Sequence, residues 1–168
     1  PPHLPLDSKL LFEENGNINI ELLRNHLLKE GKITKKDFKY IINKFVEIIR
    51  LEPNLIKITD PVIIVGDIHG QFYDLNTLFN LGGNISSNKY VFLGDYVDRG
   101  SFSIEVVLLL YSMKIRYKQN IWLLRGNHEC RQLTSFFNFK LECEIKYDLD
   151  IYNEIMISFD SLPVACLI

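Results

Sequence analysis

The hydrophobic and polar residues follow one pattern in the first third of the chain and another pattern after it. Over residues 21–30, and again from residue 35 to Pro53, apolar side chains recur every three or four positions, which is the spacing of amphipathic helices. The string Thr34-Lys35-Lys36-Asp37 predicts a capping box at the start of the second helix. Residues 1–59 are therefore expected to form a helical segment that packs on the rest of the chain.

From residue 60 the pattern changes to short, continuous apolar runs that alternate with helical patterns. Runs of this length, without polar alternation, are typical of parallel strands in a sheet that is covered on both faces. Strands separated by helices indicate an α/β fold. The expected strands are 62–65, 90–93, 121–124 and a fourth at 162–168, and the expected helices are 72–81, 104–117, 136–147 and 149–159.

Composition and charge exclude several classes of function. The chain has 168 residues, a formal net charge of −2 and an ordinary apolar content, so nothing favours nucleic acid or an anionic membrane as a partner. It contains no apolar run of about 18 residues, the length that a membrane span requires, and residues 1–5 do not resemble a secretory signal. Three widely spaced cysteines argue against a disulfide framework and favour a cytoplasmic location.

A block of polar residues directly follows each of the first three expected strands. Because the carboxyl ends of parallel strands meet at one edge of a sheet, these side chains are expected to lie close together. Any one block alone also fits a turn, a solvated loop or a helix cap. Together they offer oxygen and imidazole ligands suited to zinc, manganese or iron. The blocks contribute Asp67 and His69, then Asp95, Asp98 and Arg99, and finally Asn127, His128 and Glu129.

The full strings around these residues resemble the signature of a known family. Gly66-Asp67-Ile68-His69-Gly70-Gln71, Leu93-Gly94-Asp95-Tyr96-Val97-Asp98-Arg99-Gly100 and Leu124-Arg125-Gly126-Asn127-His128-Glu129 resemble the phosphoprotein phosphatases, the metal-dependent Ser/Thr phosphatases. The continuation from Cys130 to Tyr147 is most similar to the calcineurin (protein phosphatase 2B) catalytic-subunit branch. The resemblance implies a metallophosphoesterase-type β-sandwich flanked by helices. The similarity covers nearly the whole chain, but only about the first half of that catalytic domain, from residue 60 to residue 168.

The resemblance also implies a role for each residue of the blocks. Two metal ions (Fe, Zn or Mn) would hold a bridging hydroxide that attacks phosphoserine or phosphothreonine. An EF-hand regulatory subunit (calcineurin B), calmodulin and phosphoprotein substrates are the implied partners. Asp67 and His69 would bind the first metal, Asp95 would bridge both, Asn127 would bind the second, Arg99 would hold phosphate, and His128, oriented by Asp98, would be the general acid.

This sequence departs from the family in its histidines. The family completes its second metal site with two further histidines, and adds a second phosphate-binding arginine, from the half of the domain that follows. Only His3 and His26 remain here, and both lie before the expected sheet, where they are expected to be surface or packing residues. The 168-residue chain alone is therefore expected to bind metal poorly and to turn over slowly, if at all. A non-catalytic binding module and a metallophosphoesterase with another phosphoester substrate remain as alternatives.

Four more residues close to the blocks are expected to have structural roles. Arg131 is expected to form a structural ion pair rather than to contact phosphate. Cys130 is expected to be a buried, inert thiol. Tyr96 is expected to form part of a pocket wall, and Trp122 part of the strand core.

Overall fold

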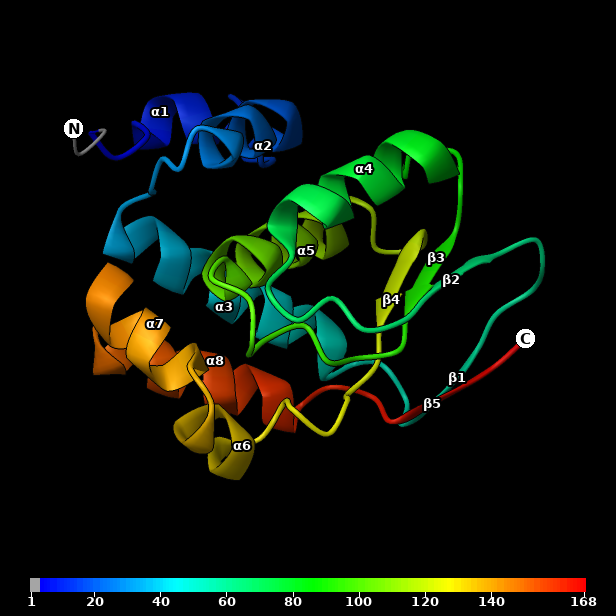
Figure 1. The fold of residues 1–168 in the computed structure, drawn as a ribbon. Helices are drawn as coiled ribbons and strands as arrows, with labels where there is room; N and C mark the ends of the chain where they lie inside the picture. The colour runs from blue at the N-terminus through cyan, green and yellow to red at the C-terminus, as the bar shows by residue number, and fades with distance from the viewer. Residues whose placement is uncertain (1–3) are drawn as a thin grey trace.

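The computed structural model describes residues 4–168, and Figure 1 shows its fold. His3 lies outside these residues. Helices make up almost half of the chain, and five short strands form two separate parallel sheets. The helices are α1 (Ser8–Leu11), α2 (Ile20–Leu28), α3 (Lys35–Ile49), α4 (Phe72–Gly82), α5 (Ser103–Arg116), α6 (Arg131–Phe136), α7 (Phe139–Lys146) and α8 (Leu149–Asp160). The strands are β1 (Leu55–Lys57), β2 (Ile63–Val65), β3 (Tyr90–Phe92), β4 (Ile121–Leu123) and β5 (Ala165–Leu167).

The larger sheet has the order β2-β3-β4, and all of its strands are parallel, as the pattern predicted. Helices α4 and α5 form the crossover connections that adjacent parallel strands require. Alternate side chains of the strands point to opposite faces. Tyr90 and Phe92 of β3 pack into the main helical core, whereas Val91 joins a second, smaller core.

The smaller core lies between the two sheets. It joins Ile56 of β1 and the half-buried Cys166 of β5 to Val91 and Leu124 of the larger sheet, with Trp122 packed against it. The strand expected at 162–168 is confirmed, but it pairs with β1 in a separate sheet. The apolar pattern did not predict β1, which lies inside the segment that was expected to be helical. Two sheets with a shared core and helices outside agree with the expected sandwich.

Helix α5 is the centre of the main core, which also includes residues of α2, α3, α4, α7 and α8. Phe45 of α3 stacks on Tyr111 of α5, with ring centroids 3.6 Å apart and an interplanar angle of 9°. The helical segment before β1 therefore shares one continuous core with the α/β region. The N-cap half of the capping box at the start of α3 is confirmed, because Thr34 Oγ1 accepts the Asp37 N–H at 3.1 Å, while Asp37 Oδ2 accepts the Thr34 hydroxyl at 2.7 Å.

One predicted helix is wrong. Residues 136–147 were expected to form a single helix, but the chain breaks at Phe137 and Asn138, between α6 and α7. The break has a tertiary cause, since the Phe139 N–H and the Asn138 side chain bond to the loop that follows β3. Among residues 4–168, no helix is long and apolar enough to cross a membrane.

Candidate metal and phosphate site

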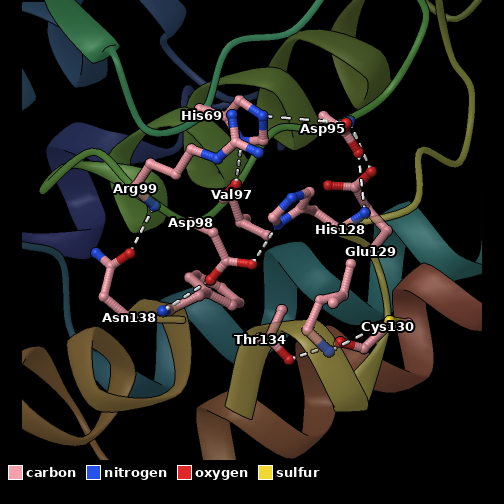
Figure 2. Close-up of polar contacts among 12 residues, drawn as sticks. His69, Asp95, Val97, Asp98, Arg99, His128, Glu129, Cys130, Thr134 and Asn138 are labelled. Atoms are coloured by element: carbon pink, nitrogen blue, oxygen red, sulfur yellow. Dashed lines mark hydrogen bonds and ion pairs between the residues drawn. The ribbon is translucent and has the colours of Figure 1, made fainter. Parts of the chain in front are cut away.

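The loops that follow β2, β3 and β4 meet at one edge of the larger sheet, as expected for parallel strands. Figure 2 shows His69, Asp95, Asp98 and His128 directed toward one another in this region, although they come from three different loops. The backbones of the second and third loops also approach each other closely. A side chain at Gly94, whose φ is +114°, would collide with the backbone of Gly126.

His69 has the geometry of a metal ligand. Its Nδ1 lies 2.7 Å from the Val97 carbonyl oxygen, which accepts the ring proton and leaves a lone pair on Nε2. That Nε2 is buried and has no hydrogen-bond partner among the described residues. It lies 3.7 Å from Asp67 Oδ2 and 4.0 Å from Asp95 Oδ2. Two ligands about 2 Å from one ion lie roughly 3–4 Å apart, so these donors fit a shared metal.

His128 and Asp98 form a buried pair beside these donors. His128 is 2% exposed and Asp98 is fully buried. His128 Nδ1 lies 2.7 Å from Asp98 Oδ2, and the other carboxylate oxygen accepts the Phe139 N–H at 3.0 Å. The His128 backbone N–H donates to Asp95 Oδ1 at 2.9 Å. A carboxylate that fixes Nδ1 leaves Nε2 to act as either a proton donor or a metal ligand.

The geometry supports a role for His128 Nε2 as a metal ligand. One ligand atom from each of His69, Asp95 and His128 lies within 4.8 Å of the others, a spacing that could hold an ion. The rings of the two histidines are 4.7 Å apart and nearly perpendicular. Geometry alone therefore leaves His128 with two possible roles, and a measurement of metal content distinguishes them.

Four residues of the site have left-handed backbone conformations. The φ angles are 44° for His69, 55° for Asp95 and 69° for both Asp98 and Arg99. Each such residue other than glycine costs roughly 1–2 kcal/mol. Conformations of this kind persist where surrounding contacts enforce them, and they cluster at functional sites.

Glu129 holds the backbone at Asp95, one of these four residues, and the sequence did not reveal this role. The side chain is fully buried, and its carboxylate accepts the N–H groups of Asp95 at 2.7 Å, Tyr96 at 2.8 Å and Gly126 at 2.9 Å. Burial raises the pKa of Glu129 to about 7, although these three N–H groups act in the opposite direction. Its place after His128 was the only signal, and no spacing rule separates a buried glutamate from an exposed one there.

The remaining predicted site residues lie at the rim. The Asp67 side chain is 67% exposed, and Asn127 and Arg99 are also exposed. The guanidinium of Arg99 stands 5.9 Å from the centre of the Phe137 ring. Contacts of 4.0 Å or less therefore link five of the seven predicted residues, Asp67, His69, Asp95, Asp98 and His128. The exposed side chains of Asp67, Arg99 and Asn127 form the open side, where a ligand would arrive.

The neighbouring residues mostly have the structural roles expected of them. Arg131 forms a bidentate pair with Asp160, at 3.0 and 2.7 Å. His26 Nε2 donates to the Lys32 carbonyl oxygen at 2.8 Å on the surface. Cys130 is a free thiol, but it is only half-buried. Tyr96 does not line a pocket: it is 2% exposed, and its hydroxyl donates to the Leu124 carbonyl oxygen at 2.7 Å.

Comparisons with known proteins agree with this arrangement. Residues 60–168 match the family described as calcineurin-like phosphoesterase. Over 98% of its length the chain is 48% identical to serine/threonine-protein phosphatase 2B catalytic subunit A2 of Saccharomyces cerevisiae, and it is 45% identical to subunit A1 of that yeast. The chain spans only 27% and 30% of the lengths of these two relatives.

Solved structures show the same relationship. A protein serine/threonine phosphatase of Saccharomyces cerevisiae, described as similar to human phosphatase PP5, is 37% identical and superposes with a TM-score of 0.84. That match covers 89% of this chain and 51% of the other. A cold-active protein-tyrosine phosphatase of a Shewanella species is 21% identical with a TM-score of 0.56, covering 71% of this chain and 43% of the other, and shows the fold alone.

Proposed function

The chain belongs to the calcineurin-like phosphoesterase family, and from that premise we propose that it is part of a protein serine/threonine phosphatase of the 2B type. The observation that carries the proposal is the buried His128–Asp98 pair, with Nδ1 and Oδ2 2.7 Å apart. It lies beside the possible metal ligands His69 and Asp95. A proton donor next to ligands for metal is the combination that phosphoester hydrolysis requires.

We propose two metal ions, which would be iron, zinc or manganese; the residues present fit the first ion and supply part of the ligand set of the second. The lone pair of His69 Nε2 is buried without a partner, and carboxylate oxygens of Asp67 and Asp95 lie within 4.0 Å of it. We assign these three residues to the first ion, and Asp95 with Asn127 to the second. Two bound ions would supply an activated water and would neutralise charge on the phosphoryl oxygens.

The other residues of the site bind the substrate and move the proton. The exposed guanidinium of Arg99 holds phosphate oxygens, for which its planar fork is well suited. His128 Nε2 donates a proton to the departing serine or threonine oxygen. Asp98 holds the ring through Nδ1 and stabilises its protonated form, and burial of both groups strengthens that interaction.

The partners, location and domain division of the chain belong to the same proposal. The two yeast relatives are named as catalytic subunits, which supports a regulatory partner. We propose an EF-hand subunit of the calcineurin B kind, calmodulin and phosphoprotein substrates, in the cytoplasm. We also propose that residues 1–59 precede the catalytic domain and that residues 60–168 form its first part. The family match begins at residue 60, which supports this boundary.

The experiment compares two substrates on the full-length protein reconstituted with Mn²⁺. A phosphoserine peptide and a dinucleotide are supplied at equal concentration, and the release of phosphate and of mononucleotide is followed. We expect turnover of the phosphopeptide only. Cleavage of the dinucleotide alone would favour a different phosphoesterase, and bound metal without turnover of either substrate would favour a non-catalytic module.

A further inference from the structure

The loop that presents Arg99 has an unfavourable backbone conformation at two consecutive residues. Asp98 and Arg99 are consecutive residues in the left-handed region, both with φ of 69°. Residues with a side chain disfavour this conformation, so external contacts must maintain it. The direction of the Arg99 side chain depends on that backbone, because the side chain leaves from it.

Asn138 makes two of the contacts that hold this backbone, in addition to the bonds of the Gly100 N–H to the His69 and Asp98 carbonyl oxygens, both at 2.9 Å. Its Oδ1 accepts the Arg99 N–H at 2.6 Å, and its Nδ2 donates to the Gly100 carbonyl oxygen at 2.8 Å. One carboxamide therefore bonds to the peptide group before Arg99 and to the peptide group after Gly100. Figure 2 shows the result: the backbone of Arg99 faces Asn138, while its side chain extends toward His69.

Asn138 makes these bonds in place of the N-cap bond that is usual for an asparagine at its position. It occupies the N-cap position of α7, where an asparagine normally accepts an N–H from its own helix. Here its side chain makes no such cap bond. The first N–H of the helix, that of Phe139, is instead satisfied by Asp98 Oδ1 at 3.0 Å. The Asn138 side chain thus bonds to the loop, and the Asp98 side chain bonds to the first N–H of the helix. These bonds couple the start of α7 to both Asp98 and Arg99.

The rest of α7 supports the far end of the same loop. Lys146 Nζ donates to the Ser101 carbonyl oxygen at 2.8 Å, and Glu142 Oε1 accepts the Ile104 N–H at 2.9 Å. Both side chains are rigidly placed, because they also bond to each other at 2.9 Å. Helix α7 therefore supports the loop, and within residues 4–168 it is Asn138, the N-cap of this helix, that bonds to Arg99 itself.

We propose that Asn138 is a positioning residue for phosphate binding, acting through Arg99. This inference rests on the proposed phosphatase function, because that function assigns phosphate to Arg99. Loss of the carboxamide frees the Arg99 backbone to leave its left-handed conformation, and the guanidinium then no longer meets the phosphate in the required orientation. Misplacement of a binding group by about 1 Å is enough to weaken such an interaction strongly.

The test is a double-mutant cycle in the full-length, Mn²⁺-loaded protein. Inhibition by inorganic phosphate, KM and kcat for a phosphoserine peptide, and metal content are measured for Asn138→Ala, Arg99→Ala and the double variant. We expect Asn138→Ala to raise the inhibition constant of phosphate about tenfold with unchanged metal content. In the Arg99→Ala background the same substitution should change that constant by less than about twofold.

The outcomes separate this proposal from the one on which it rests. An equal loss in both backgrounds would overturn the role of Asn138 and leave the phosphatase function untouched. A normal phosphate constant in Arg99→Ala itself would instead contradict the proposed function. The matched control is Asn84→Ala, which removes a similar turn bond, 2.9 Å to the Ser86 N–H, on the opposite side of the sheet and should change neither constant.

A second variant protects the test against misfolding. Asn138→Ser keeps a residue that helices accept at the N-cap, but its hydroxyl is too short to bond both backbone groups. We expect a smaller rise in the phosphate constant than for alanine, again absent in the Arg99→Ala background. Should Asn138→Ala fail to fold, additivity between Asn138→Ser and Arg99→Ala would overturn the proposal by itself.

Discussion

Replacing Asp98 with asparagine tests whether this carboxylate supports a proton donor. Asp98 is fully buried and uses both oxygens, one for His128 Nδ1 at 2.7 Å and one for the Phe139 N–H at 3.0 Å. Asparagine is almost the same size, so packing is preserved. Its single carbonyl oxygen cannot serve both partners, and if it stays with Phe139, an amide N–H faces the His128 ring and opposes its protonated form.

The size of the effect follows from the interaction that is lost. A hydrogen bond to a charged group contributes roughly 1.5–3 kcal/mol. At about 1.4 kcal/mol for each factor of ten, kcat for a phosphoserine peptide should fall between about tenfold and 150-fold. The size of the loss in kcat should depend on the leaving group. A serine alkoxide needs a proton as it leaves, whereas nitrophenolate is stable as an anion and needs little help from an acid.

The assay therefore compares a phosphoserine peptide with p-nitrophenyl phosphate in the full-length protein. Asp98→Asn should lose much more kcat on the peptide than on the nitrophenyl ester, with metal content unchanged. Asp160→Asn is the matched control, because Asp160 pairs with Arg131 on the surface, away from the reacting atoms. Equal losses on both substrates would refute the reasoning, since a general acid cannot act equally on leaving groups of such different stability.

Two further predictions concern stability. Phe45→Ala should lower the free energy of unfolding by about 3–5 kcal/mol in denaturant titrations, because Phe45 is fully buried against Tyr111. The control Phe136→Ala, at a position that is 81% exposed, should change it by less than about 0.5 kcal/mol. A small effect at Phe45 would show that the N-terminal helices fold separately. The Lys35 ammonium, 2.7 Å from Asp148, holds the pKa of that carboxyl below its usual 3.8, so the pair stabilises the fold above about pH 4 and loses its effect as pH falls through the lowered pKa. Lys35→Met should therefore flatten the fall in unfolding free energy below about pH 4, and an unchanged slope would contradict this.

Much of the fold could be predicted because local pattern and tertiary structure agree in it. The three apolar runs that became β2, β3 and β4 are continuous since the sheet is covered by helices on one face and by the second sheet over part of the other. The helices between them were predicted from apolar stretches too long for strands, and α5 is buried along nearly its whole length. The polar blocks could be placed at one edge of the sheet because parallel strands put their carboxyl ends together.

The features that could not be predicted depend on partners far away in the sequence. Strand β1 has only three residues, and it is a strand because β5, more than a hundred positions later, pairs with it. The break before α7 exists because Asn138 and Phe139 bond to the Asp98–Arg99 loop rather than to their own helix. Local propensity carries no trace of such contacts.

The prediction of the site was limited in the same way, because contacts between residues distant in the sequence could not be predicted. Its ligand-type residues stood out because three blocks of aspartate, asparagine and histidine each follow a strand of the same sheet. Asn138 did not stand out, and Glu129 was named in the third block without a role of its own, because these residue types are common at helix starts and surfaces. Both hold site residues in position through backbone N–H groups. Tyr96 was misplaced for the same reason, since its position between two site residues gave no hint that its ring points into the core.

The central claim is that His128 is a proton donor beside a two-metal site rather than one of the metal ligands. The most direct measurement is the metal content of full-length His128→Asn, determined together with its turnover of a phosphoserine peptide. Two metal ions per protein with turnover reduced at least about a hundredfold is the predicted result. Loss of metal in proportion to the loss of turnover would contradict the claim and would place His128 in a ligand set with His69 and Asp95.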